Sequence, residues 1–291
     1  MFIAIENENL RGTIDTFGGE LIALTDGYYN YLWSGDEAFW IGRSPHLFPI
    51  IGTLKNNELI TERHIFNIGK HGFLRNNEFS IYEKNNDSIV LFLKSNEETL
   101  KMYPFQFTFY VTHSLTEKGV ITSYRIVNED NKNIYFNVGG HVGVRCPLLV
   151  GEEFSDYEIT FSKALTKAVY FPENDDPINR ESVVPFFNHC NSLELSHDYF
   201  KKGPMIIDSI EAKSLTLRSK KSSNGIKFSY EDFPVLALWT FGQKKAPYIC
   251  LEPWHGLPAM VGDGVFCEKP YILELAPGED KRLSYQIEII E

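Results

Sequence analysis

The 291-residue sequence has few cysteines and no excess of positive charge. Lysine and arginine together number 28 against 39 aspartates and glutamates, which gives a formal net charge of −11. That charge repels phosphate backbones and anionic membrane surfaces, so we expect neither nucleic acid nor a membrane as a partner. The cysteines include no C-x-x-C pair, which argues against a zinc clip and a dense disulfide framework. They stand far apart, at Cys146, Cys190, Cys250 and Cys267.

Long apolar runs and helical periodicity are also missing. No stretch approaches the roughly 20 apolar residues that span a bilayer, and Met1–Gly12 lacks the basic start and apolar core of a secretory signal. We therefore expect a cytoplasmic protein. No long window places apolar residues at helical spacing, which predicts few and short helices. No repeat or low-complexity linker divides the chain, so we expect a single domain over residues 1–291.

Alternation with period two is what the sequence does contain. In Pro104–Thr112 the side chains of Phe105, Phe107, Phe109 and Val111 fall on one face, as in a half-buried strand. Clusters of Asn, Asp, Gly and Lys separate the alternating segments and predict turns. The pattern favours an all-β sandwich or barrel. The other alternating segments are Ser88–Leu93, Val120–Val127, Tyr157–Phe161, Ser214–Leu217, Ile226–Tyr230 and Leu283–Ile289.

Three short segments hold a histidine or a carboxylate in an apolar, glycine-marked context: Gly69–Phe73, Asn137–His141 and Cys250–Trp254. Glycines beside a histidine let backbone or ligand approach closely, because no Cβ fills that space. Glu252 follows four residues of apolar character and is expected to end a buried strand, where an ionised carboxylate needs a partner. Taken one at a time, each segment is equally compatible with a structural histidine or a buried polar residue.

The order of these segments resembles the galactose mutarotase-like superfamily of aldose 1-epimerases, and within it the LacX-like branch. The resemblance covers nearly the whole chain and implies a large antiparallel β-sandwich with a sugar in an open cleft on its concave face. It implies no metal and no cofactor. Its landmarks are Thr16–Leu21, Leu32–Trp33, Leu47–Gly52, His71–Phe73, Gly140–His141, Leu251–Trp254 and Leu275–Glu279.

The resemblance also implies site residues. His141 is expected as the general acid, Glu252 as the general base, and His71 as a substrate-holding partner. Opening a sugar ring requires removal of the proton from the C1 hydroxyl and donation of a proton to the ring oxygen, and a carboxylate and an imidazolium suit these steps. A nearby Glu252 carboxylate would raise the pKa of His141 and keep it charged near neutral pH.

One position departs from the family pattern. Many relatives carry an arginine where this chain has Thr53, and that arginine helps to bind sugar hydroxyls. We expect Lys55 or Arg75 to supply a cation there, although a lysine lacks the planar fork of a guanidinium. Trp254 is expected as an aromatic wall, because sugars present apolar C–H faces.

Four functions follow as hypotheses. The first is a cofactor-independent isomerase that interconverts the anomers of a hexose or related sugar. The second is a hexose-6-phosphate 1-epimerase, which needs a cation cluster such as Lys55, Lys70 and Arg75. The third is a non-catalytic carbohydrate-binding or regulatory module. The fourth is a metalloenzyme with His71, His141 and Glu252 as ligands.

Overall fold

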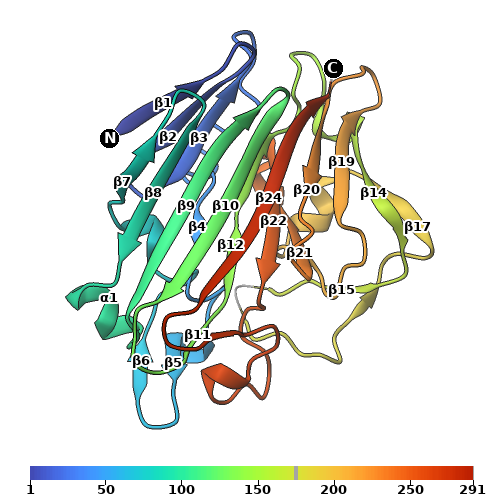
Figure 1. Ribbon diagram of the computed structural model, residues 1–291. Helices are drawn as coiled ribbons and strands as arrows, with labels where there is room; N and C mark the ends of the chain where they lie inside the picture. Colours follow the sequence, from blue (N-terminus) through green and yellow to red (C-terminus); the bar gives the residue numbers. More distant parts are fainter. Residues whose placement is uncertain (174–175, 291) are drawn as a thin grey trace.

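The computed structural model describes residues 1–173 and 176–290. Its largest sheet has nine antiparallel strands and faces the viewer in Figure 1. In spatial order they are β17 (Cys190–Glu194), β14 (Tyr157–Leu165), β19 (Ser214–Ser219), β20 (Gly225–Ser229), β24 (Asp280–Ile290), β10 (Gly119–Asn128), β9 (Phe107–Thr116), β8 (Ser88–Lys94) and β7 (Ser80–Lys84). All seven segments with period-two alternation lie in this sheet or overlap its strands.

A second sheet of eight strands lies behind the first in the view of Figure 1. Seven strands follow one another in space, and β13 (Val142–Arg145) pairs with β22 beside them. The seven are β16 (Val184–Pro185), β15 (Ala168–Tyr170), β18 (Met205–Ile207), β21 (Val235–Trp239), β22 (Tyr248–His255), β12 (Val138–Gly140) and β4 (His46–Leu47).

The main core fills the space between these two sheets. Phe109 and Ile126 of the nine-stranded sheet and Leu236 and Leu251 of the eight-stranded sheet belong to one buried apolar cluster. Alternation in β9 explains the arrangement, because every second side chain points inward while Tyr110 and Thr112 face solvent. The predicted antiparallel β-sandwich is confirmed.

Smaller elements surround the sandwich. A three-stranded sheet of β1 (Phe2–Glu6), β2 (Arg11–Asp15) and β3 (Glu20–Thr25) covers the edge near β7 and β8. There are also two-stranded antiparallel sheets, one of β5 (Glu58–Ile60) with β6 (Ile65–Asn67) and one of β11 (Ile134–Phe136) with β23 (Leu273–Leu275). Helices are short, as predicted. They are α1 (Glu97–Met102) and the 3₁₀ turns Lys55–Asn57, Leu74–Asn76, Phe154–Asp156, His197–Phe200, Gly242–Lys244 and Phe266–Glu268.

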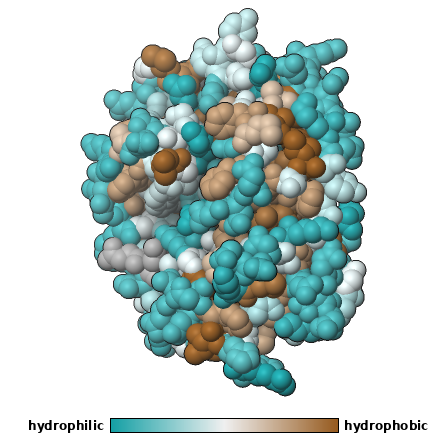
Figure 2. Space-filling view, turned by 90° about the vertical axis from the view of Figure 1, so that its left-hand side faces the viewer, coloured by the Kyte–Doolittle hydropathy of each residue, from teal (hydrophilic) through white to brown (hydrophobic). Residues whose placement is uncertain are grey.

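The surface is largely hydrophilic on the side that Figure 2 shows, where apolar residues form separate small groups. Isolated apolar side chains are normal on a soluble fold and do not mark a docking surface by themselves. Among the described residues, no helix has both the length and the apolar character needed to cross a bilayer.

Candidate active site

Strand β22 carries the first half of the site. Its residues alternate between two faces: Ile249 and Leu251 pack into the main core, whereas Cys250, Glu252 and Trp254 point to the opposite face of the eight-stranded sheet. Glu252 therefore lies on the side of this sheet that faces away from the nine-stranded sheet. It stands in the middle of the strand, not at its end as expected.

His141 lies at the junction of β12 and β13, two strands that both pair with β22. Its backbone N–H donates to the carbonyl of Pro45 at 3.0 Å, which fixes the junction against a neighbouring segment. This arrangement places His141 Nε2 3.3 Å from Glu252 Oε2. The His141 side chain is 10% exposed and that of Glu252 2% exposed, so the pair is almost dry and only the histidine reaches solvent.

His71 approaches this pair from the turn at Gly69–Phe73. Its backbone N–H donates to the carbonyl of Gly52 at 2.7 Å, and its Nδ1 accepts the Gly52 N–H at 3.0 Å. Neutral His71 therefore carries its proton on Nε2. The His71 and His141 rings lie 5.6 Å apart between centroids and nearly perpendicular. The structure thus brings together the two histidines and the glutamate that the sequence singled out.

The turn that presents His71 depends on unusual backbone geometry. His71 itself has φ +65°, and the next residue, Gly72, has φ +73°. A Cβ at Gly72 would lie 2.0 Å from the carbonyl oxygen of Phe48, so only glycine fits. A non-glycine residue in the left-handed region is uncommon, and such conformations are frequent where a side chain is held for function.

Two tryptophans, which the sequence analysis did not single out, enclose His141. The ring of Trp40 lies 4.8 Å from the imidazole and that of Trp239 5.7 Å, between centroids. Trp33 holds the Trp40 segment by donating its indole N–H to the Trp40 carbonyl at 2.8 Å. Alternation along β21 could have indicated Trp239, but no local pattern marks Trp40. The two rings thus lie beside His141, at the position where the sequence led us to expect Trp254.

Trp254 itself has a different position. It shares a face with Glu252 but is only 2% exposed and packs with Leu47, Ile51 and Val235. Little of its ring is left for a sugar to stack on, so we assign it to the apolar support of the site. Lys55 is likewise apart from the pair: it is exposed and lines a separate cavity of about 150 Å³.

Arg75 and Lys70 supply positive charge close to the histidines. The Arg75 guanidinium donates to the Lys70 carbonyl at 2.8 Å, which ties the two residues into one turn. Both side chains lower the pKa of His71 and of His141 through their charge. Thr53, in the place of the family arginine, accepts the Ala259 N–H with its carbonyl at 2.8 Å.

Burial sets the protonation of the acid–base pair. It lowers the pKa of His141 to about 3, and Lys70 and Arg75 add to the shift. It also raises the pKa of Glu252 well above its usual value, against the opposing effects of Lys70 and the Trp254 indole. The expectation that Glu252 keeps His141 charged near neutral pH is wrong, because burial lowers the pKa of His141 instead. Burial thus favours the neutral form of both members of the pair.

The same face holds three groups able to bind a metal ion. One ligand atom each from His141, Cys250 and Glu252 lie within 4.8 Å of one another, and all three residues are buried. The sequence hypothesis of a metal site placed His71 in this set, but the group whose ligand atoms lie this close contains Cys250 in its place. Cys250 could have been found from the strand alternation, since it precedes Glu252 by two residues.

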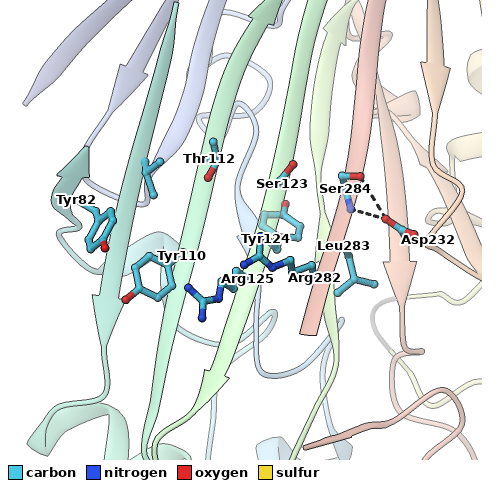
Figure 3. Close-up of a pocket in the computed structure, with 11 residues that line it drawn as sticks. Tyr82, Tyr110, Thr112, Ser123, Tyr124, Arg125, Asp232, Arg282, Leu283 and Ser284 are labelled. Carbon is cyan, nitrogen blue, oxygen red and sulfur yellow. Dashed lines mark hydrogen bonds between the residues drawn. The ribbon is translucent and has the colours of Figure 1, made fainter. Parts of the chain in front are cut away.

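A different concavity lies on the outer face of the nine-stranded sheet. Figure 3 shows this groove of about 330 Å³ with Tyr82, Tyr110 and Arg125 along it. Asp232 at one end accepts hydrogen bonds from the backbone N–H of Ser284 at 2.7 Å and its hydroxyl at 3.3 Å. The groove and the His141–Glu252 pair thus belong to different sheets.

Comparison with known proteins gives one consistent family. The aldose 1-epimerase family model matches residues 1–288, and the plasmid-encoded LacX protein of Lactococcus lactis is 35% identical over the full length of both chains. A galactose mutarotase-like protein from Lactobacillus casei is 30% identical with a TM-score of 0.89, covering 99% of this chain and 100% of that one. A galactose mutarotase related enzyme from Lactobacillus acidophilus is 29% identical with a TM-score of 0.92, covering 99% and 97%. The chain therefore belongs to the aldose 1-epimerase family.

Proposed function

We propose that this protein is an aldose 1-epimerase that interconverts the α and β anomers of a hexose or related sugar without a cofactor. The proposal rests on one observation: His141 Nε2 lies 3.3 Å from Glu252 Oε2, and this buried pair lies beside the Trp40 ring. The C1 hydroxyl oxygen and the ring oxygen of a pyranose are bonded to the same carbon. Two side chains this close can therefore exchange protons with both oxygens at the same time.

The proposed reaction transfers two protons during ring opening and two during ring closure. Glu252 takes the proton of the C1 hydroxyl, His141 gives a proton to the ring oxygen, the C1–O bond to the ring breaks, and the carbonyl forms. Rotation about C1–C2 exposes the other face, and the reverse transfers close the ring. Burial favours the neutral forms of both groups, so a proton passed from Glu252 to His141 across 3.3 Å creates the reactive ion pair without any exchange with water.

The sugar is proposed to sit against Trp40 and Trp239, with His71 donating from Nε2 to a sugar oxygen. Aromatic rings suit the apolar C–H face of a pyranose. Nδ1 of His71 is fixed by the Gly52 N–H, so the ring keeps one donor direction. This assignment replaces the Trp254 wall and leaves Lys55 out of the site.

Polarimetry on freshly dissolved sugars tests the proposal. We expect the protein to accelerate the optical relaxation of α-glucose or α-galactose above the buffer rate at micromolar concentration or below. A related hexose series extends the test to other C2 and C4 configurations. Buffer-rate relaxation with every sugar of the series contradicts the proposal.

A second candidate substrate class is the hexose 6-phosphates, which the positive charges of Lys70 and Arg75 near His141 favour. A dianionic phosphate gains strong charge-assisted hydrogen bonds from such groups. Including glucose 6-phosphate in the same polarimetric series separates the two classes, because the phosphate ester should then relax with a higher kcat/KM than glucose. A preference that Arg75→Gln abolishes would assign the phosphate to this turn.

A further inference from the structure

The group formed by His141, Cys250 and Glu252 combines ligand types that soft and borderline divalent cations prefer. An imidazole nitrogen, a thiol sulfur and a carboxylate oxygen are all ligands of zinc in proteins. Glu252 Oε2 is buried and makes no hydrogen bond of normal geometry in the described part of the chain, although His141 Nε2 lies 3.3 Å away. Buried polar atoms are normally paired, so this oxygen beside an imidazole nitrogen is open to a ligand.

The spacing of the three atoms fits a tetrahedral ion. With metal–nitrogen and metal–oxygen bonds of about 2.0 to 2.1 Å, two ligand atoms of a tetrahedron lie about 3.3 Å apart. His141 Nε2 and Glu252 Oε2 are 3.3 Å apart. The sulfur lies within 4.8 Å of both partners, against an edge of about 3.6 Å in a tetrahedral site, so the proposed site requires Cys250 Sγ to move toward the ion.

Charge at the site is compatible with a cation once the thiol ionises. A Glu252 carboxylate and a Cys250 thiolate together neutralise a divalent ion, while the positive charge of Lys70 lies on the solvent side. The ion can enter along His141, the member of the group whose side chain is 10% exposed. Trp40 and Trp239 flank that opening, which leaves the fourth position for a water molecule or a sugar hydroxyl.

We propose that His141, Cys250 and Glu252 form a site for a thiophilic divalent cation such as Zn²⁺, and that the bound cation blocks the acid–base pair. The binding half of this inference stands on the geometry of the three side chains. The inhibitory half rests on the proposed function, since the ion occupies the nitrogen and the oxygen that would exchange protons with the sugar.

Binding must release protons. Burial raises the pKa of the Cys250 thiol, with a further contribution from Glu252, so the free protein holds a neutral S–H group. Formation of the metal–sulfur bond expels this proton. Calorimetry in buffers of different ionisation enthalpy counts the protons released for each ion bound.

Titration with Co²⁺ alone and Zn²⁺ alone tests the binding half on the whole protein. With Co²⁺ we expect the absorption bands of a tetrahedral ion together with a thiolate-to-metal charge-transfer band, both displaced by Zn²⁺. Cys250→Ser should abolish the charge-transfer band and weaken Zn²⁺ binding by more than about tenfold. Cys190→Ser, the same change at a cysteine in β17, is the matched control and should keep both.

The possible outcomes test cation binding and inhibition by the cation separately. Zn²⁺ binding that is unchanged in Cys250→Ser, or the absence of a charge-transfer band in a folded wild-type protein, overturns the site. If the protein is an active epimerase, Zn²⁺ should slow it at the concentration at which the Co²⁺ band is displaced, and relief by a chelator should be complete. Full activity of the Zn²⁺-saturated protein overturns the inhibitory half. A Cys250-dependent band in a protein that relaxes no sugar supports the site and removes the proposed function alone.

Should Cys250→Ser fail to fold, Cys250→Ala and His141→Asn provide the same test. Each removes one ligand, and circular dichroism with thermal melting shows whether the sandwich is intact. Tight Zn²⁺ binding that persists in a folded form of both variants contradicts the three-residue site.

Discussion

Glu252 is the residue on which the proposed chemistry depends most directly. Burial raises the pKa of the Glu252 carboxyl and so favours its neutral form, which a glutamine matches closely in shape and charge. We expect Glu252→Gln to fold with unchanged stability, to bind sugar in a calorimeter, and to lose about 10² to 10⁴ in kcat by polarimetry.

The matched control for that change is Glu288→Gln, at a half-buried glutamate of β24 that pairs with Lys227 at 2.8 Å. It should keep full activity. If Glu252→Gln relaxes sugars as fast as the wild type, the acid–base assignment fails, and retained binding would favour the carbohydrate-binding module.

The pH dependence of the rate is a second property of the His141–Glu252 pair. Activity requires one proton on the pair, and burial moves the two macroscopic pKa values apart, to about 3 for His141 and well above the usual range for Glu252. We expect kcat/KM, corrected for the buffer reaction, to be flat from pH 5 to neutral pH and to fall only on the alkaline side. An acidic limb with a midpoint near 6.5 would show that His141 titrates as an exposed histidine and would contradict this account.

In the turn that carries His71, we expect an alanine substitution to be destabilising at one glycine and tolerated at another. Gly72→Ala places a Cβ 2.0 Å from the Phe48 carbonyl oxygen at φ +73°, whereas a Cβ at Gly69 of the same turn meets no atom within 4 Å. We expect Gly72→Ala to lower the free energy of unfolding by roughly 1 to 3 kcal/mol and to raise KM, because His71 moves.

Gly69→Ala should change both quantities little, within about 0.5 kcal/mol for stability. Chemical denaturation and steady-state kinetics measure the two effects separately. Equal stability losses at both glycines would show that the turn is not held against Phe48.

Individual strands show which parts of the fold and of the candidate site could be predicted from the sequence. The alternation in Phe105–Val111 predicted a strand correctly, because each strand of the nine-stranded sheet has one solvated face. Strand β22 is apolar along most of its length, so no pattern distinguished Cys250 from the other buried residues, although it lies two residues before Glu252 and shares its face.

Long-range contacts account for the remaining differences. Trp40 meets His141 through chain folding across about a hundred residues, which no local pattern encodes. The low pKa of His141 has the same origin, because its burial is set by three separate segments of the chain. The family resemblance identified the His141–Glu252 pair, whereas only the structure identified the residues that surround it.

For the whole molecule, buried ionisable groups predict an optimum in stability. The folded-state pKa is lowered to about 3 for His46 and His141 and to about 4 for His113, chiefly by burial. Below pH 6.5 these histidines bind protons in the unfolded chain but stay neutral in the folded protein. The free energy of unfolding therefore falls as the pH falls. Burial raises the pKa of Glu20 to about 7 and that of Glu252 well above its usual value, so stability is lost as the pH rises from the unfolded-state pKa toward the folded-state pKa of each group.

We therefore expect a maximum in the free energy of unfolding between about pH 6 and 7, measured by urea denaturation. On the acidic side each such histidine adds a slope of at most about 1.4 kcal/mol per pH unit. His113→Gln should reduce that slope, and the same change at exposed His64 is the control. Stability that keeps rising from pH 6 to pH 9 would contradict the burial of the two glutamates.

The junction of β12 and β13 has a consequence for how such a protein can change over evolution. His141 and Glu252 are held by neighbouring strands of one sheet, whereas Trp40, Lys70 and Arg75 come from connecting segments outside the main strands. In the proposed function, proton transfer thus belongs to residues held by the strands, whereas part of the sugar contact comes from the connecting segments. Substitutions or length changes in the connecting segments can alter which sugar is accepted while the strands keep the reaction, so related proteins can acquire new substrates without rebuilding their chemistry.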